Sequence, residues 1–120
     1  MERVAFIAHR GKQVLVEDFS GMCPGEEFEA AIREARALIE AQPGKSVLAC
    51  VDVAGARFDA ETIGTLKDFT ARNAPWVKAA AVVGIEGLLS VALSAISRFS
   101  GRTFRTFKDR TSALDWLVEQ

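Results

Sequence analysis

The sequence predicts a small α/β domain: a mixed sheet that opens with a β-hairpin and carries four helices, in the order ββαβαβαβα. Residues 46–53 and 78–84 are continuously apolar rather than alternating, which is typical of strands covered on both faces. Around them lie segments whose apolar residues recur every three or four positions, which indicates amphipathic helices. Strands and helices that alternate in this way form a sheet that is parallel after the opening hairpin.

The first half of the chain predicts the hairpin, one helix and one strand. Residues 4–8 and 14–16 are short apolar runs, and Gly11 between them can adopt the positive φ of a tight turn. Residues 26–41 form the first helix, in which Glu29 is expected to pair with Arg33 one turn later. The expected buried stripe of this helix is Phe28, Ile32, Ala35 and Ile39.

The second half predicts three helices and two more strands. Asp59 is a good N-cap for a helix that runs to about residue 72, and residues 86–99 form a third helix. Residues 103–107 form a short strand, after which Asp109 caps a final helix. The expected inward residues of the second and last helices are Ile63, Leu66, Phe69, Ala113, Leu114, Leu117 and Val118.

Composition limits the classes of function. The chain has 120 residues, of which 49% are apolar, enough for one core, so we expect a single domain over residues 1–120. The 15 basic and 16 acidic side chains give a net charge of −1, which favours neither nucleic acid nor an anionic membrane as partner. One histidine and two cysteines suit neither a zinc cage nor a disulfide framework, so we expect free thiols, no metal and no cofactor. We find no leader and no apolar run near the ~20 residues that span a bilayer, and we expect a cytoplasmic protein.

The residues offer no catalytic set. Asp52 ends a central strand, as a phosphate-receiving aspartate does, but the acidic pair and the lysine that such a site needs are missing. Asp59 and Glu61 are explained as an N-cap and a first-turn acid, so a carboxylate site with Asp52 is disfavoured. His9 falls at the hairpin turn and is expected to be solvated. We therefore predict that the protein is not an enzyme and assign no catalytic residue.

A basic segment near the end of the chain departs from the neutral average. Five cationic residues fall within residues 98–110, interleaved with phenylalanines. Basic residues near aromatic rings can bind single-stranded nucleic acid, but the rings here are expected to face the core. We interpret the cations as surface residues, and as a candidate contact for an acidic protein or a lipid headgroup. They are Arg98, Arg102, Arg105, Lys108 and Arg110.

The predicted third helix is apolar almost all round, whereas a helix that covers one face of a sheet needs only a stripe. Neighbouring helices, a second copy of the chain or a lipid tail are the candidates for covering the rest. The residues of this candidate surface for an apolar ligand or a homodimer are Leu88, Leu89, Ala92, Leu93 and Ile96.

The element order and residues 52–66 resemble the STAS fold, the family of sporulation-type anti-sigma factor antagonists and of the cytoplasmic tails of anion transporters. The end of the chain, from residues 78–84 to 113–117, resembles the SpoIIAA-like branch, which is often labelled STAS/SEC14 and is mostly without assigned function. In the members that act as switches, an aspartate before the second helix precedes a serine that a partner kinase phosphorylates. Asp59 matches that aspartate, but Ala60 stands at the position of the phosphoacceptor.

The resemblance implies a non-enzymatic interaction or regulatory module that lacks the usual serine switch. Its expected partner is a protein, with a regulatory kinase or an anti-sigma factor as the candidate class. The alternative is a module of SEC14-like type that binds a lipid or small apolar ligand at the third helix; a homodimer is compatible with both. The expected partner-binding residues are Gly55, Arg57, Phe58, Asp59, Ala60, Glu61 and Thr62.

Overall fold

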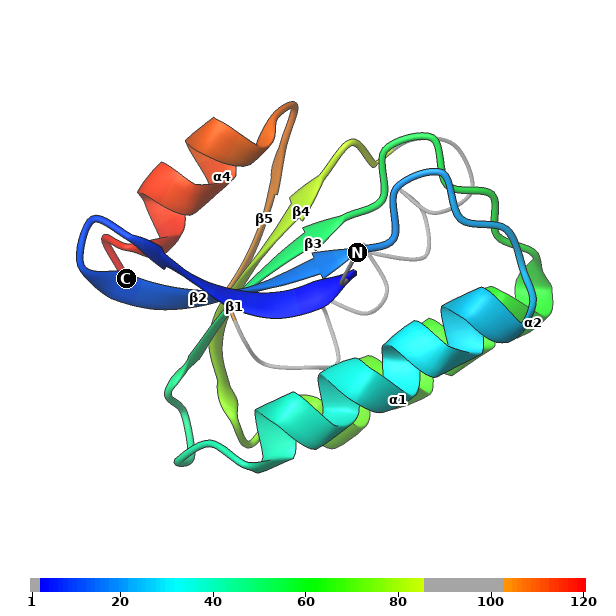
Figure 1. Cartoon of the computed structure of the whole chain (residues 1–120), viewed down its shortest axis with the longest axis horizontal. Helices are drawn as coiled ribbons and strands as arrows, with labels where there is room; N and C mark the ends of the chain where they lie inside the picture. Colours follow the sequence, from blue (N-terminus) through cyan, green and yellow to red (C-terminus); the bar gives the residue numbers. More distant parts are fainter. Residues whose placement is uncertain (1–2, 86–102) are drawn as a thin grey trace.

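The computed structural model of the chain describes residues 3–85 and 103–120, which form a five-stranded mixed sheet with helices on both faces (Figure 1). The strands are β1 (Val4–His9), β2 (Lys12–Asp18), β3 (Val47–Asp52), β4 (Val77–Val83) and β5 (Thr103–Phe107), and they lie in that order. β1 is antiparallel to β2, and the remaining neighbours are parallel. The helices are α1 (Glu26–Glu40), α2 (Ala60–Asn73) and α4 (Arg110–Leu117). The α/β class and the opening hairpin are thereby confirmed.

Three of the four predicted helices fall within the described residues. The predicted third helix, over residues 86–99, lies outside them, so the full order ββαβαβαβα stays a prediction. No described helix has both the length and the apolar character that crossing a membrane requires.

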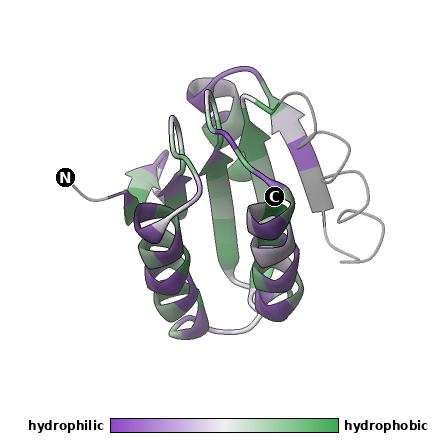
Figure 2. Cartoon of the chain, turned by 90° about the vertical axis from the view of Figure 1, so that its right-hand side faces the viewer, coloured by the Kyte–Doolittle hydropathy of each residue, from purple (hydrophilic) through white to green (hydrophobic). Residues whose placement is uncertain are grey.

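The sheet has an apolar core on each face. Helices α1 and α2 lie side by side on one face and α4 lies on the other (Figure 1). The central strands are apolar along their length, while α1 and α2 are mixed (Figure 2). Alternate residues of β3 enter opposite cores: Ala49 packs toward α1 and α2, and Leu48 and Cys50 pack toward α4. A strand covered on both faces is therefore apolar at every position, as the uninterrupted run predicted.

Helix α1 buries the expected stripe, together with Ala31. The expected pair between Glu29 and Arg33 is wrong. Arg33 donates instead to the carboxylate of Glu26, at 2.7 Å. Residues seven apart lie two turns apart on the same side of a helix, and the long arginine side chain spans that distance. Glu26 and Arg33 are both exposed, so the pair contributes little to stability.

Both aspartate caps are confirmed. Asp59 accepts a hydrogen bond from the backbone N–H of Thr62 at 2.8 Å, and the Thr62 hydroxyl accepts one from the Asp59 N–H at 2.8 Å. These reciprocal bonds form a capping box at the start of α2. Asp109 accepts from the N–H of Ser112 at 2.8 Å at the start of α4.

The expectation for His9 is wrong. Its Nε2 lies 2.8 Å from Oδ1 of Asp115 on α4, and its side chain is half-buried rather than solvated. Arg10 also approaches Asp115, at 3.4 Å. The hydrogen bond from His9 lowers the pKa of Asp115 despite the opposing effect of burial. Because Asp115 lies 106 residues further along the chain, local sequence carries no sign of this contact.

The two thiols differ in accessibility. Cys23 is exposed in the β2–α1 loop, whereas Cys50 is fully buried in β3, where burial raises the pKa of its thiol to about 12. Since the thiolate is the reactive form, we expect an aromatic disulfide reagent to label Cys23 alone in the native protein and both cysteines in denaturant. Cys23→Ser should abolish the native reaction; labelling of the native Cys23→Ser variant at the rate of the unfolded chain would contradict the described core.

Candidate functional site

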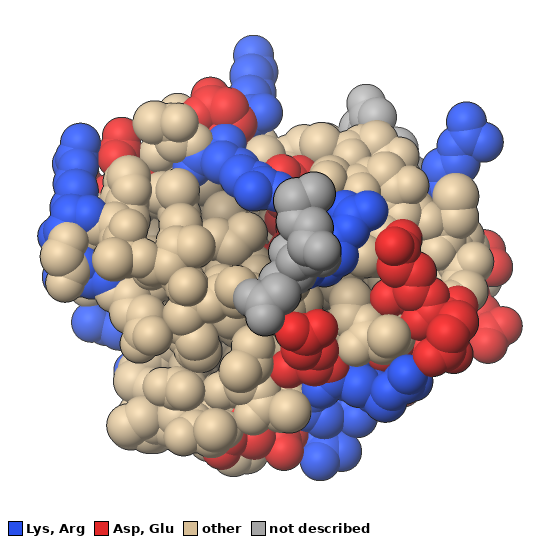
Figure 3. Space-filling model, viewed as in Figure 1, with Lys and Arg blue, Asp and Glu red and all other residues tan. Residues whose placement is uncertain are grey.

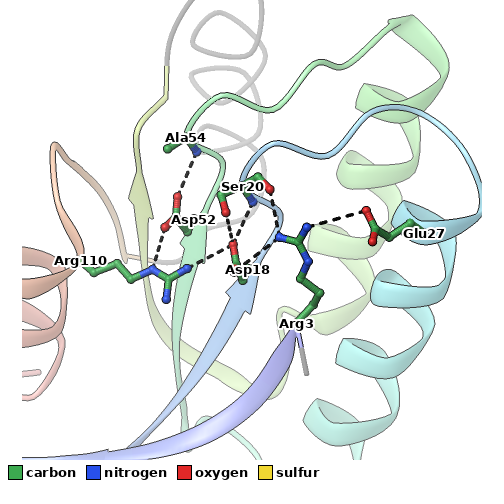
Figure 4. A network of polar contacts seen from close by, with 7 residues as sticks. All are labelled: Arg3, Asp18, Ser20, Glu27, Asp52, Ala54 and Arg110. Carbon is green, nitrogen blue, oxygen red and sulfur yellow. Dashed lines mark hydrogen bonds and ion pairs between the residues drawn. The ribbon is translucent and has the colours of Figure 1, made fainter. Parts of the chain in front are cut away.

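Two carboxylates and one guanidinium meet where the central strands end (Figure 4). Asp18 ends β2 and Asp52 ends β3, and the two residues are direct neighbours in the parallel register. Arg110, the first residue of α4, donates from Nε to Asp52 Oδ2 at 2.7 Å and lies 3.1 Å from Asp18 Oδ1 through Nη2. The other oxygen of Asp52 accepts from the N–H of Ala54 at 3.0 Å. One arginine therefore ties α4 to the ends of two strands.

The same network continues toward the N-terminal strand (Figure 4). Ser20 donates to Asp18 from its N–H at 3.0 Å and also from its hydroxyl. Arg3 donates to the carbonyl of Ser20 at 3.0 Å and lies 3.5 Å from Asp18 and 3.9 Å from Glu27. The carboxylate of Asp18 is thus held between two arginines and a serine, and the start of the β2–α1 loop is fixed with it.

The network favours the charged forms of Asp18 and Arg110. Burial by itself raises the pKa of Asp18, but the hydrogen bonds from Ser20 and the charge of Arg110 outweigh it, and the pKa is lowered overall. The hydrogen bond to Asp52 raises the pKa of Arg110. A carboxylate that stays ionised and fully bonded is a structural anchor, and it is poorly suited to move protons near neutral pH.

Of this network, the sequence indicated only Asp52 and Arg110, and it did not associate them. Arg110 was assigned to the basic surface segment, whereas the structure directs it at two carboxylates. Two other residues of the basic segment are described. The guanidinium carbon of Arg105 lies 5.6 Å from the ring centroid of Phe107 and 6.0 Å from that of Trp116, and Lys108 is exposed. Arg98 and Arg102 lie outside the described residues. The sequence held one indication of this network. Asp18 and Asp52 end adjacent strands, and Arg110 directly follows the N-cap residue Asp109 at the same edge of the sheet.

Charge on the visible face is mixed rather than segregated. Across the described residues of the view in Figure 3, Lys and Arg are spread among acidic and uncharged residues. Acidic side chains gather over the first turn of α1, which contains Glu26, Glu27 and Glu29. Negative charge at a helix N-terminus complements the helix dipole, so this group needs no ligand to explain it.

Most of the predicted partner-binding residues are exposed at the start of α2, but two are not. Phe58 packs its ring against Phe28, 5.4 Å away, and belongs to the core beneath α1 and α2. Thr62 is 3% exposed. The exposed members are Gly55, Arg57, Asp59, Ala60 and Glu61.

The β3–α2 loop that carries these residues is held by its neighbour. Gly21 donates its N–H to the carbonyl of Ala54 at 2.9 Å, and Arg57 donates its N–H to the carbonyl of Met22 at 2.8 Å. Gly55 has φ +70°, a conformation that favours glycine. The β2–α1 and β3–α2 loops thus form one rigid platform at the carboxyl edge of the sheet.

The structure separates the carboxylates that the sequence considered together. Asp52 is bound by Arg110, while Asp59 caps α2, where the backbone and side-chain bonds with Thr62 lower its pKa. In residues 3–85 and 103–120, no three His, Cys, Asp or Glu side chains gather where they could hold a metal ion.

The hydroxyl of Thr62 is closed off. It accepts from the Asp59 N–H and donates within the same cap, 2.9 Å from the Asp59 carboxylate and 3.0 Å from the Asp59 carbonyl. A kinase must open the first turn of α2 to reach this oxygen.

The predicted surface for an apolar ligand or a homodimer lies outside the described residues and stays a prediction. Its residues are Leu88, Leu89, Ala92, Leu93 and Ile96.

No family model matches the sequence, and no curated protein matches it. Among solved structures, the chain is similar to an uncharacterized protein of the DUF3478 family with a SpoIIAA-like fold, from Shewanella loihica PV-4. The TM-score is 0.77, and the match covers 95% of this chain and 91% of that one. This chain has a SpoIIAA-like fold. The sequence identity is 17%, so the likeness shows the fold alone.

The SpoIIAA-like fold confirms the resemblance drawn from residues 52–66 and from the order of the elements. Within this SpoIIAA-like domain, the start of α2 retains the capping aspartate, while the following position carries the methyl group of Ala60 and no hydroxyl.

Proposed function

We propose that this chain is a non-enzymatic protein-interaction module that binds its partner through the β3–α2 loop and the first turn of α2. One observation carries the proposal: Gly55 and Arg57 are exposed on a loop that backbone hydrogen bonds hold in place, and Ala60 and Glu61 are exposed on the first turn of α2 that follows it. A surface already fixed before binding loses little conformational freedom when a partner docks. The SpoIIAA-like fold supports the same assignment.

The chemistry of this surface suits a polar protein partner. Arg57 offers a positive charge and Asp59 and Glu61 offer negative charges, and the small residue Ala60 stands between the two acids in the sequence. Such a pattern selects partners by charge complementarity and allows close approach at the centre. Because residue 60 has no hydroxyl and that of Thr62 is enclosed in the cap, we propose that any switching of the complex resides in the partner. A regulatory kinase or an anti-sigma factor is the proposed partner class.

A photo-crosslinking side chain at residue 60 tests the surface in the native cell. We expect Ala60 to give a discrete crosslinked product with a second protein. The matched control is Ala71, which is exposed on the same helix roughly 16 Å further along its axis. Equal products from both positions, or none from Ala60, would refute the proposed surface.

A charge reversal gives the quantitative test once the crosslinked protein is purified. We expect Arg57→Glu to weaken its binding about tenfold or more in titration calorimetry, since a central charged contact contributes of that order. Arg57 and Glu61 are better probes than Asp59, whose replacement would also uncap α2. Arg33→Glu, on the exposed side of α1, should leave the affinity unchanged. An Arg57→Glu affinity equal to that of the unmodified protein would contradict the proposal.

A further inference from the structure

A pocket lies at the opposite edge of the sheet from the proposed partner surface, where the parallel strands begin. It has a volume of about 410 Å³ and lies between the starts of β2, β3 and β4, the α1–β3 connection and Gln120. This volume is in the range of pockets that hold small organic molecules. The site is independent of the proposed partner surface, which stands at the carboxyl ends of the same strands.

The ionisable side chains that line this pocket are all cationic: Lys12, Lys45 and Lys78. In the described part of the chain, none of the three forms an ion pair with an Asp or Glu side chain. Lys45 Nζ donates to the carbonyl of Ala74 and Lys78 Nζ to a main-chain oxygen of Gln120, each at 3.0 Å. Each ammonium group has three donors, so one such bond positions the group and leaves donors for a ligand.

The backbone holds two of these lysines in fixed, irregular positions. Lys45 has φ +55°, and its N–H donates to the carbonyl of Pro75 at 2.9 Å. Val47 pairs with Val77 but Leu48 pairs with Ala79, so Lys78 is the extra residue of a β-bulge. A bulge redirects the side chain of its extra residue and is common beside binding sites. The rim of the pocket is therefore formed by the fold rather than by free side chains alone.

The remaining lining is part apolar and part polar. Phe6, Val47 and Leu48 supply apolar surface, and Gln13 and Gln42 supply amide groups. We propose that this pocket binds a small organic anion, with a phosphate or carboxylate group at the lysines and an aromatic or short hydrocarbon body against the apolar residues. Three lysines that pair with no acidic side chain of the described residues, in a chain of net charge −1, carry this inference, since they create local positive potential that the overall composition conceals.

Titration of the labelled protein with phenyl phosphate, followed by amide NMR, tests the proposal. We expect saturable shifts at Gln13, Ser46 and Leu48, which line the pocket, and none at Ala60 on the partner surface. Phenol lacks the anion and inorganic phosphate lacks the apolar body, so each should bind about tenfold more weakly or worse. Equal affinity for phenol or for inorganic phosphate would overturn the proposal, as would saturation without shifts at the pocket.

Charge removal supplies the matched variants. The double substitution Lys12→Met/Lys45→Met should weaken the binding of phenyl phosphate about tenfold or more. Lys67 is exposed on α2 and does not line the pocket, so the Lys67→Met variant should bind phenyl phosphate as the unmodified protein does. Unchanged shifts elsewhere in the spectrum establish that each variant is folded. Equal weakening by both variants would overturn the proposal, because it would reveal a general charge effect. Binding to vesicles containing phosphatidic acid without binding of phenyl phosphate would also overturn it, in favour of a membrane surface. Loss of crosslinking at Ala60 would leave this result unaffected.

Discussion

Replacing Gly84 with alanine is expected to destabilise the protein by about 3 kcal/mol, from backbone strain and overpacking together. Gly84 follows β4 with φ +76°, and its N–H donates to the carbonyl of Phe107 at 3.0 Å. A Cβ at this position would lie 2.7 Å from Cβ of Ala54 and 2.8 Å from its Cα. Ala54 cannot move away without straining the bonds that hold the β3–α2 loop, which are Gly21 N–H to the Ala54 carbonyl and Val53 N–H to the Val83 carbonyl.

Gly64 provides a control of opposite sign. It lies within α2, and a Cβ there would meet nothing within 4 Å. Gly64→Ala should raise stability by about 0.5–1 kcal/mol, because alanine favours the helix. Urea denaturation of the two variants measures both effects. If Gly84→Ala is too unstable to study, Gly84→Ala/Ala54→Gly should recover part of the loss by removing the nearest methyl group. A denaturation midpoint for Gly84→Ala at or above that of the unmodified protein would contradict the close contact between residue 84 and Ala54.

The second large effect is expected from Arg110→Met, at about 2 kcal/mol near neutral pH. The substitution would leave Asp18 and Asp52, neighbours in register, without the cation between them, and the Asp52 side chain is only 10% exposed. Removing one partner of a buried ion pair leaves an uncompensated charge, which is strongly unfavourable. The expected loss is smaller than the roughly 3–5 kcal/mol typical of a fully buried pair, because the Arg110 side chain is 42% exposed.

The loss should depend on pH in a defined direction. Although burial opposes them, the hydrogen bonds from Ser20, and after them Arg110, lower the pKa of Asp18 in the folded protein from its ordinary value of 3.8. These interactions therefore stabilise the fold above that value, and Arg110→Met removes the part that Arg110 supplies. This stabilisation disappears as the pH falls through the lowered folded pKa. The difference between the native protein and Arg110→Met should therefore be largest near neutral pH and shrink below about pH 4.

Two variants separate this network from general charge effects. Asp52→Asn/Arg110→Met should be more stable than Arg110→Met alone, because it removes one of the two facing carboxylates. Arg33→Met, which breaks an exposed pair on α1, should change stability by less than about 0.5 kcal/mol. If Arg33→Met and Arg110→Met proved equally destabilising in thermal and urea unfolding, the anchoring role of Arg110 would have no support.

Local sequence determined the elements and their caps. The aspartates at 59 and 109 begin α2 and α4, because a short carboxylate can accept from the free N–H groups of a first turn. The run from residue 46 to 53 is a strand covered on both faces, because both faces of β3 enter a core. The caps depend on residues within one helical turn, and the buried strand is recognised because its successive residues are apolar.

The candidate sites illustrate the limit of such reasoning. Residues 52–66 suggested a candidate partner surface, which stays a proposal, and only the fold turned Phe58 and Thr62 inward and left Arg57 and Ala60 exposed. The pocket was missed altogether, since Lys12, Lys45 and Lys78 are some 33 residues apart along the chain and belong to no motif. Parallel strands bring their first residues to one edge of the sheet, and that geometry alone gathers the three charges.

The sequence by itself thus determined the α/β class, the hairpin, the helix caps and the missing hydroxyl at residue 60, because each depends on residue type or short-range spacing. Tertiary structure alone decided that Arg110 holds Asp18 and Asp52, that His9 meets Asp115, and that three lysines share one pocket. The physical reason is the same in each case. These contacts join side chains from distant segments, and their positions follow from strand register and from the face on which α4 packs.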